Sequence, residues 1–132
     1  MYRPDGKALN DPFVTKLFKW IFKVGSVCLV IDEIDEFCNG PNIIHDELKK
    51  LIKQGRKRHV CIFIGSQRPS GIPTICMSEA NIVVVFYLQN SKDRAKIAEW
   101  IHEDFYRNVE DHDFRIWKRS KKNETTYIKQ AA

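Results

Sequence analysis

Three short apolar runs, separated by amphipathic segments, constrain the fold of this chain most strongly. They lie at residues 27–31, at residues 59–65 ("HVCIFIG") and at residues 81–88 ("NIVVVFYL"). None of them alternates regularly with polar residues, which is typical of parallel strands covered on both faces. Strands of this kind that alternate with helices predict an α/β fold with a mostly parallel sheet.

The segments between and after these runs carry helix and hairpin signals. Asp11 can cap a helix that begins at Pro12, and apolar residues then recur on one face until Gly25. Residues 43–54 and residues 91–105, the latter capped by Ser91, predict two further helices. The breaker-rich stretch 66–76 is predicted to be a loop, and residues 113–129 alternate like a C-terminal β-hairpin.

Composition limits the class of protein. With 132 residues, 43% of them hydrophobic and 30% charged, the chain fits one globular domain spanning residues 1–132. No apolar run approaches the roughly 18 residues that cross a bilayer, and the polar N-terminal end differs from a secretory signal. We therefore expect a cytoplasmic protein with no membrane segment. The net charge of +5 indicates an anionic partner.

The four cysteines do not form a recognisable metal or disulfide pattern. Their spacings are wide and irregular, and some of them lie inside apolar runs. In an intracellular protein such thiols are usually reduced. We expect all four to be free: Cys28, Cys38, Cys61 and Cys76.

Polar side chains follow the first two apolar strands where each strand ends. Asp32 and Glu33 come after the first strand, and Ser66 and Gln67 come after the second. Ligands bind at the carboxyl ends of strands in such sheets, so we expect these residues to face one crevice. Two adjacent carboxylates repel each other, and a divalent metal would offset that repulsion.

Phosphoryl transfer is one chemistry that needs such a pair. Asp32 would hold Mg²⁺ through water, and Glu33 would take a proton from the attacking water. The alternative is that the pair begins an exposed polar loop, which Asp35 and Glu36 continue.

A family resemblance favours the first interpretation. "LVIDEID" at residues 29–35 is similar to the Walker B strand of P-loop ATPases. Residues 47–73 and 78–97 follow it, and residues 1–105 as a whole resemble the FtsK/HerA superfamily of DNA-pumping ATPases. Four short pieces carry the resemblance in the expected order: the DE pair, the "GR" that ends the next helix, the "SQRP" that ends the next strand, and the Asn before the following strand.

The resemblance implies a partial RecA-like P-loop fold, a three-layer sandwich, and specific roles. Asp32 matches the metal-associated aspartate, Glu33 the catalytic glutamate and Gln67 the polar sensor, with Ser66 beside it as a nucleotide contact. Arg56 matches an arginine finger that is inserted into a neighbouring subunit, and Arg58 is the runner-up. The implied cofactors are ATP and Mg²⁺. The implied partners are DNA and other copies in a homo-oligomeric ring, with a hexamer expected, in a bacterial, archaeal, viral or plasmid-encoded system.

One part of the family pattern is missing. A P-loop needs G-x-x-x-x-G-K-[ST], and none of the six glycines begins that pattern. We therefore expect the chain to be the C-terminal part of such an ATPase, unable to bind ATP tightly alone. In the family, the P-loop strand lies between the strand that ends at Gly65 and the strand at residues 82–88. Without it, we expect a rearranged or oligomeric sheet.

Two other functions stay open at this point. The chain could be a catalytically silent module that binds nucleic acid or assembles subunits. It could also be an unrelated doubly wound domain in which Asp32 and Asp35 bind a metal or accept a phosphoryl group. For DNA, a basic turn in the predicted hairpin is a candidate contact, with a solvated turn as the alternative. Its residues are Lys118, Arg119, Lys121 and Lys122.

Overall fold

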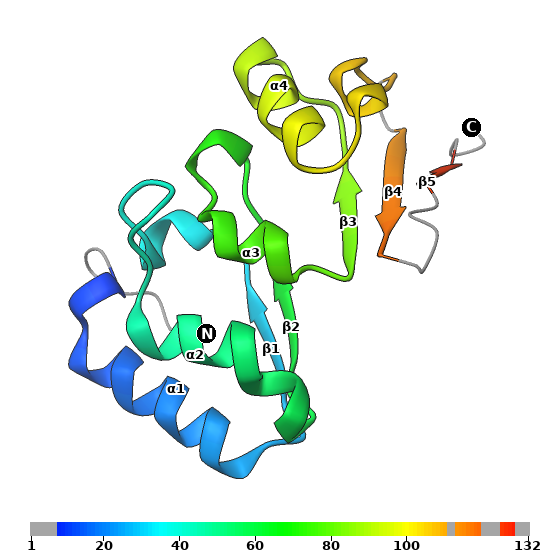
Figure 1. Ribbon diagram of the computed structural model, residues 1–132. Helices are drawn as coiled ribbons and strands as arrows, with labels where there is room; N and C mark the ends of the chain where they lie inside the picture. The colour runs from blue at the N-terminus through cyan, green and yellow to red at the C-terminus, as the bar shows by residue number, and fades with distance from the viewer. Residues whose placement is uncertain (1–7, 111–112, 120–124, 129–132) are drawn as a thin grey trace. The chain divides into compact units, whose positions relative to one another are not determined.

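The computed structural model describes residues 8–110, 113–119 and 125–128, the last four as backbone only. The chain divides into two compact units, Met1–Glu79 (unit 1) and Ala80–Ala132 (unit 2) (Figure 1). Unit 1 contains the first two apolar strands, and unit 2 contains the third strand and the C-terminal hairpin.

Unit 1 is built from helices and one parallel pair of strands. β1 (Cys28–Ile31) and β2 (Cys61–Ile64) pair in parallel, with Cys28 opposite Cys61 and Ile31 opposite Ile64. This pairing and the surrounding helices confirm the α/β class. The other elements of unit 1, in order, are η1 (Ala8–Asn10), α1 (Pro12–Val24), η2 (Ile34–Phe37), α2 (Asp46–Gln54), η3 (Gly55–Arg58), η4 (Pro69–Gly71) and α3 (Thr74–Glu79).

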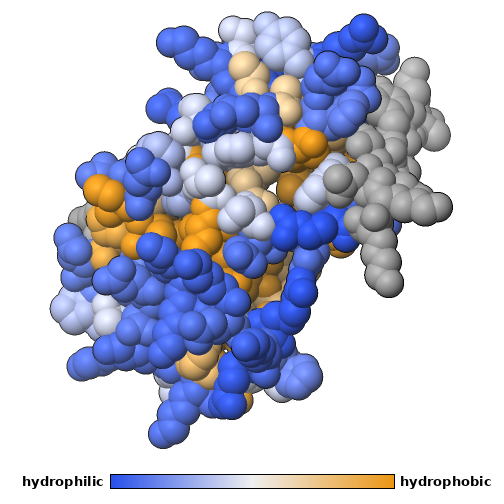
Figure 2. All heavy atoms as spheres, viewed as in Figure 1, coloured by the Kyte–Doolittle hydropathy of each residue, from blue (hydrophilic) through white to orange (hydrophobic). Residues whose placement is uncertain are grey.

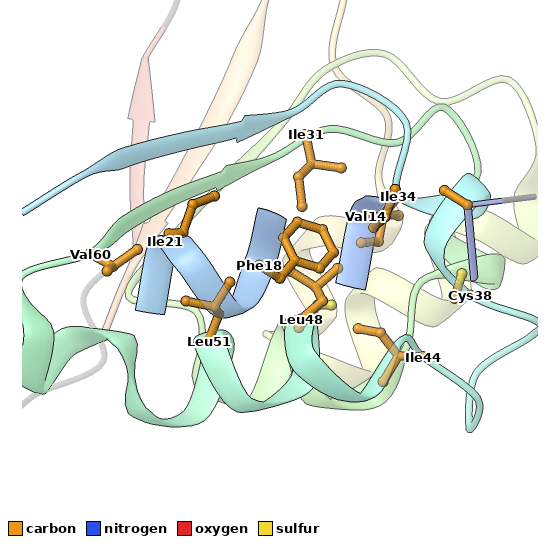
Figure 3. Packing of buried hydrophobic residues seen from close by; sticks show 12 residues of the cluster. Val14, Phe18, Ile21, Ile31, Ile34, Cys38, Ile44, Leu48, Leu51 and Val60 are labelled. Atoms are coloured by element: carbon orange, nitrogen blue, oxygen red, sulfur yellow. The ribbon is translucent and has the colours of Figure 1, made fainter. Parts of the chain in front are cut away.

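The core of unit 1 lies between one face of the strand pair and the helices α1 and α2. Phe18 of α1 is only 2% exposed. Its ring lies 5.7 Å from the ring of Phe37 and 5.2 Å from the ring of His45. The predicted inward face of α1 is confirmed, because its apolar residues point at those of α2 and β1 (Figure 3). The buried residues shown there include Val14, Phe18, Ile21, Ile31, Ile34, Leu48 and Leu51.

The other face of the β1–β2 pair is exposed. Leu29 and Ile62 pack against the core, whereas Val30 is 70% exposed and Phe63 is 59% exposed. The expectation that these strands are covered on both faces is therefore wrong for the described part of the chain. Both rows of side chains are apolar, so the lack of alternation in the sequence could not show that only one row is buried.

Two segments of unit 1 differ from the predicted boundaries. α2 begins at Asp46 rather than at residue 43, because His45 is its N-cap: the backbone N–H of Glu47 donates to His45 Nδ1 at 3.2 Å. Residues 74–79 form the short helix α3, although residues 66–76 were expected to be a loop. Helix α1 has its predicted limits, with Asp11 Oδ1 accepting from the N–H of Phe13 at 2.7 Å.

The cap at His45 makes the stability of unit 1 sensitive to pH. His45 is 5% exposed, and its Nε2 lies 3.0 Å from Thr15 Oγ1. Burial lowers the pKa of His45 below its ordinary value of 6.5, and the carboxylates of Asp46 and Glu47 offset this only in part. The unfolded chain therefore binds more protons than the folded chain just below pH 6.5. We expect the free energy of unfolding to fall as the pH drops below about 6.5.

Urea denaturation between pH 8 and pH 5 measures this effect. His45→Asn is the matched variant, because asparagine caps a helix well and does not titrate. The wild type should lose stability more steeply than His45→Asn as the pH falls. Equal slopes for the two proteins would contradict the assignment.

In its described residues, unit 2 contains a three-stranded antiparallel sheet, the helix α4 and the short 3₁₀ helix η5. β3 (Ile82–Val85) pairs with β4 (Phe114–Lys118), which pairs with β5 (Thr125–Ile128), so the predicted hairpin is confirmed. α4 (Ser91–Trp100) is capped by Asn90, not by Ser91: Asn90 Oδ1 accepts from the N–H of Lys92 at 2.9 Å. The helix ends before residue 105, and η5 (Glu103–Tyr106) follows it.

The described strands belong to two separate sheets. Only one of the described pairings, β1 with β2, is parallel, so the sheet is smaller and less parallel than expected. The rearranged sheet, in which the strands at residues 59–65 and 81–88 pair directly, is not observed; the oligomeric alternative stays a prediction. Within the described ranges, no helix has the length and apolar character to span a bilayer.

Candidate functional site

The carboxyl ends of β1 and β2 approach each other closely. The N–H of Gly65 donates to the carbonyl of Ile31 at 2.8 Å, and the N–H of Ile34 donates to the carbonyl of Gly65 at 3.1 Å. A Cβ atom on Gly65 would lie 2.5 Å from the carbonyl oxygen of Asp32. Only glycine therefore allows the two strand ends to come this close.

This approach brings two of the predicted site residues into contact. Gln67 Nε2 donates a hydrogen bond of 2.8 Å to Glu33 Oε1. Glu33 is half-buried, whereas Gln67 and the neighbouring Asp32 are exposed. Glu33 and Gln67 thus lie together at the end of the strand pair, and the crevice that they were predicted to face stays a prediction. The bond leaves the amide oxygen of Gln67 able to accept a further hydrogen bond, and the second oxygen of Glu33 able to take a proton.

Ser66 has an observed contact within its own loop. Its Oγ accepts a hydrogen bond of 3.0 Å from the N–H of Arg68, which shapes the start of the "SQRP" segment. Pro69 is buried and begins η4. The hydroxyl hydrogen of Ser66 can still be donated, and its contact with a nucleotide stays a prediction.

The acidic residues near the strand ends suit a metal site that has few protein ligands. Asp35 Oδ1 would lie 2.9 Å from a Cβ built on Gly71, so this carboxylate packs beside η4. Among the residues that the structure describes, no group of three or more His, Cys, Asp or Glu could hold a metal. Asp32 and Glu33 supply two carboxylates, which suits Mg²⁺ that is held mainly by water and by substrate phosphates.

The two candidate arginines differ in their surroundings. Arg58 Nη2 donates to the carbonyl of Lys23 at 2.8 Å, and Arg58 Nε donates to the carbonyl of Phe22 at 3.2 Å. Arg58 therefore caps the C-terminal end of α1, where carbonyls lack helical partners. Arg56 is exposed in η3, before β2 begins, whereas Gln67 follows the carboxyl end of β2.

The length of β2 separates Arg56 from Glu33 of the same chain. A strand rises about 3.3 Å per residue, and Arg56 and Gln67 flank opposite ends of the strand. Arg56 cannot complete the site of its own chain.

The contacts of Arg58 predict that its removal destabilises the chain, and the neighbouring Lys57 offers a control. Arg58→Ala removes two hydrogen bonds to the end of α1 and should lower the free energy of unfolding by about 1 kcal/mol. Lys57→Ala, at an exposed position of the same short helix η3, should change it by less than about 0.5 kcal/mol. Urea denaturation of the two variants measures the difference. Equal losses would contradict the assignment of Arg58 as the cap.

Most of the basic residues that the structure describes are exposed. The surface over α1 and α2 is largely hydrophilic (Figure 2). In unit 2, Lys118 and Arg119 are exposed at the end of β4, and the guanidinium of Arg119 lies 5.8 Å from the ring of Trp117. Lys121 and Lys122 lie outside the described residues.

Two features of the site were not predicted. The close approach at Gly65 depends on the pairing of β1 with β2, although a glycine between a strand and a polar loop is a signal for it. The cap made by Arg58 depends on η3 lying beside the end of α1. No local pattern in the sequence reports such a contact.

Comparisons with known proteins give the fold. No protein-family model and no curated protein matches the chain. Among solved structures, it is similar to the genome packaging NTPase B204 of Sulfolobus turreted icosahedral virus 2 in complex with ATP-gammaS, with a TM-score of 0.77 and 18% identity. This match covers 96% of the present chain and 65% of B204.

A second solved structure is similar to the chain to a comparable extent. B204, the DNA-packaging ATPase from Sulfolobus turreted icosahedral virus, matches with a TM-score of 0.79 and 17% identity, covering 100% of the present chain and 66% of that protein. The chain thus spans about two thirds of the length of these proteins. It has, over that length, the fold of a viral genome packaging NTPase.

Proposed function

We propose that this chain is part of an ATP-hydrolysing motor of the FtsK/HerA type that packages or translocates DNA. The observation that carries the proposal is the hydrogen bond between Gln67 and Glu33 at the carboxyl edge of β1 and β2. A carboxylate oriented by a neutral amide is suited to positioning a water molecule for attack on a phosphate. The fold shared with a packaging NTPase solved with an ATP analogue supports ATP as the nucleotide.

Each site residue then has a distinct task. Glu33 accepts the proton of the attacking water, and Gln67 holds Glu33 while its amide oxygen accepts a hydrogen bond from that water. Asp32, exposed beside them, would hold Mg²⁺ through water, and Ser66 would contact the nucleotide. When bound, Mg²⁺ neutralises the charge that develops on the phosphates.

Arg56 would supply the remaining positive charge from a neighbouring copy. A guanidinium has a permanent charge and several donors in a fixed plane, which stabilises charge spread over a phosphoryl group. Because Arg56 lies at the opposite end of β2 from Gln67, it can serve only another subunit's site. The proposal therefore includes a homo-oligomeric ring. DNA is its proposed track, with Lys118 and Arg119 as candidate phosphate contacts.

A catalytically silent module of the same fold is the second candidate. The observation that favours it is the lack of a G-x-x-x-x-G-K-[ST] pattern in the 132 residues. The third possibility, a phospho-acceptor domain built on Asp32 and Asp35, has less support, because Asp35 packs beside Gly71 and the fold resembles that of an NTPase.

Binding of a fluorescent ATP analogue distinguishes the first two candidates. The measurement uses the chain alone and the chain extended by the stretch encoded immediately upstream, each with and without Mg²⁺. We expect Mg²⁺-dependent binding in the extended form. In the extended form, Asp32→Asn should raise the Mg²⁺ concentration needed for half-maximal binding of the nucleotide by about 10–100-fold. This is the usual loss of metal affinity when a residue that supports the metal indirectly is replaced.

Asp46→Asn is the matched control, since it makes the same chemical change at an exposed carboxylate in the first turn of α2. It should leave binding unchanged. No binding of the nucleotide in either form of the chain would favour the silent module. Equal effects of the two variants would contradict the role of Asp32.

A further inference from the structure

Two cysteines lie side by side on the exposed face of the β1–β2 pair. Cys28 and Cys61 are register partners in the parallel ladder, and both are exposed. They lie in the same row as Val30 and Phe63, which are also exposed, whereas the alternate residues of both strands face the core. The backbone holds the pair in place, because the N–H of Cys61 donates to the carbonyl of Val27 at 2.9 Å.

The spacing of neighbouring strands places the backbones of the two cysteines within the range that a disulfide can join. Neighbouring strands lie about 4.8 Å apart, and disulfides usually join Cα atoms that are about 4.4–6.8 Å apart. Side chains of register partners leave the sheet on the same face. The register of Cys28 and Cys61 is therefore compatible with a disulfide between them.

The other two cysteines have a different environment. Cys38 and Cys76 are buried. Burial, together with the nearby Cys38, raises the pKa of Cys76 to about 12, and the Cys38 thiol donates to the carbonyl of Gly71 at 3.8 Å. Thiolate is the reactive form of cysteine, so these two residues should be inert in the folded chain and provide an internal control.

We propose that Cys28 and Cys61 form a redox-active dithiol that closes into a cross-strand disulfide by exchange with a small disulfide of the glutathione type. One thiolate attacks a sulfur of the small disulfide and forms a mixed disulfide, releasing one small thiol. The second cysteine then attacks the mixed disulfide, forms the bond between Cys28 and Cys61, and releases the other small thiol. The two protein thiols are oxidised, the small disulfide is reduced to two thiols, and the two protein protons end on them.

The bond would link the amino ends of the two strands whose carboxyl ends carry Glu33 and Gln67. It would close a loop that contains η2, α2 and η3, and so restrict the unfolded chain. Oxidation should therefore raise the midpoint of thermal unfolding of the chain, and a reductant should reverse the rise. This inference does not depend on the nucleotide chemistry proposed above.

The test uses the native chain treated with oxidised glutathione, then blocked with an alkylating reagent, digested and analysed by mass spectrometry. We expect a peptide that links Cys28 to Cys61, with the loss of two hydrogen atoms. Cys38 and Cys76 should be alkylated only after denaturation. Glutathione on both exposed cysteines without a link, a link between two copies, or no reaction would each overturn the proposal.

Two single variants are compared, so that the test does not rely on one substitution that could disturb folding. Cys28→Ser should retain one glutathione on Cys61, and Cys61→Ser should retain one on Cys28, with no linked peptide in either. Neither variant should show the reversible rise in the thermal midpoint. A linked wild-type chain that unfolds at the same temperature as the reduced chain would overturn the stabilising role of the bond.

Discussion

Gly65→Ala should destabilise unit 1 by about 1–3 kcal/mol, the usual cost of forcing an extra carbon into a tightly packed position. The new Cβ would lie 2.5 Å from the carbonyl oxygen of Asp32 and 3.4 Å from its carbonyl carbon. Both atoms belong to the backbone, so relief requires β1 and β2 to separate at their carboxyl ends. The two backbone hydrogen bonds of Gly65, to Ile31 and from Ile34, should then weaken.

Gly71→Ala is the matched control for this prediction. Its new Cβ would meet Asp35 Oδ1 at 2.9 Å, and that carboxylate is the end of a side chain that can rotate away. Its cost should be clearly smaller, within about 0.5–1 kcal/mol. Urea denaturation of the two variants gives the comparison. If Gly65→Ala were as stable as Gly71→Ala, the close approach of the strand ends would be wrong.

Local signals were sufficient to predict some elements of the fold. Helix α1 has its predicted limits because the residues that set them lie at its ends in the sequence. Asp11 and Pro12 are at its start, and Gly25 follows its last residue. The C-terminal hairpin was predictable for the same reason, since alternation and turn residues are local patterns. Signals of this kind need no knowledge of which elements pack together.

Other features depend on contacts between distant segments, and the sequence does not report them. Val30 and Phe63 are exposed although they lie in apolar runs, because α1 and α2 pack on the opposite face of the strands. The hydrogen bonds from Arg58 to the end of α1 likewise join segments that are far apart in the sequence. Helix α2 begins later than predicted because its N-cap is His45, and histidine is an uncommon cap residue.

The candidate site was predictable in outline. The rule that carboxyl ends of parallel strands share an edge correctly predicted that Glu33 and Gln67 lie together. It could not predict that Ser66 would accept a hydrogen bond from its own loop, because that bond depends on the conformation of residues 66–68. The separation of Arg56 from the same edge follows from the order of η3, β2 and the loop after it, and this order was already present in the sequence.

The lack of a phosphate-binding pattern in the 132 residues decides which form of the chain should be used to measure turnover. Within the described residues, β1 and β2 pair only with each other, and open strand edges of this kind are prone to association. The proposed function requires a phosphate-binding segment in addition to the residues at the β1–β2 edge. The extended form of the chain is therefore the appropriate protein for measurements of turnover.

In that extended form, Glu33→Gln should lower the rate of ATP hydrolysis by about 10²–10⁴-fold, the usual contribution of a general base. Nucleotide binding should be retained. Glutamine has nearly the same shape as glutamate, and its amide oxygen can still accept the hydrogen bond of 2.8 Å that Gln67 donates. It cannot take a proton from water, so the substitution separates the chemical role of Glu33 from its structural role.

Glu36→Gln makes the same chemical change three residues further along the chain, at an exposed position in η2. Release of phosphate and binding of a fluorescent ATP analogue should both be unchanged in this control. If Glu33→Gln hydrolysed ATP at the wild-type rate, Glu33 would not be the proton acceptor. If Glu33→Gln lost nucleotide binding as well as turnover, the Glu33 carboxylate would act mainly on the nucleotide or its metal. Glu33, not Asp32, would then be the principal Mg²⁺ residue.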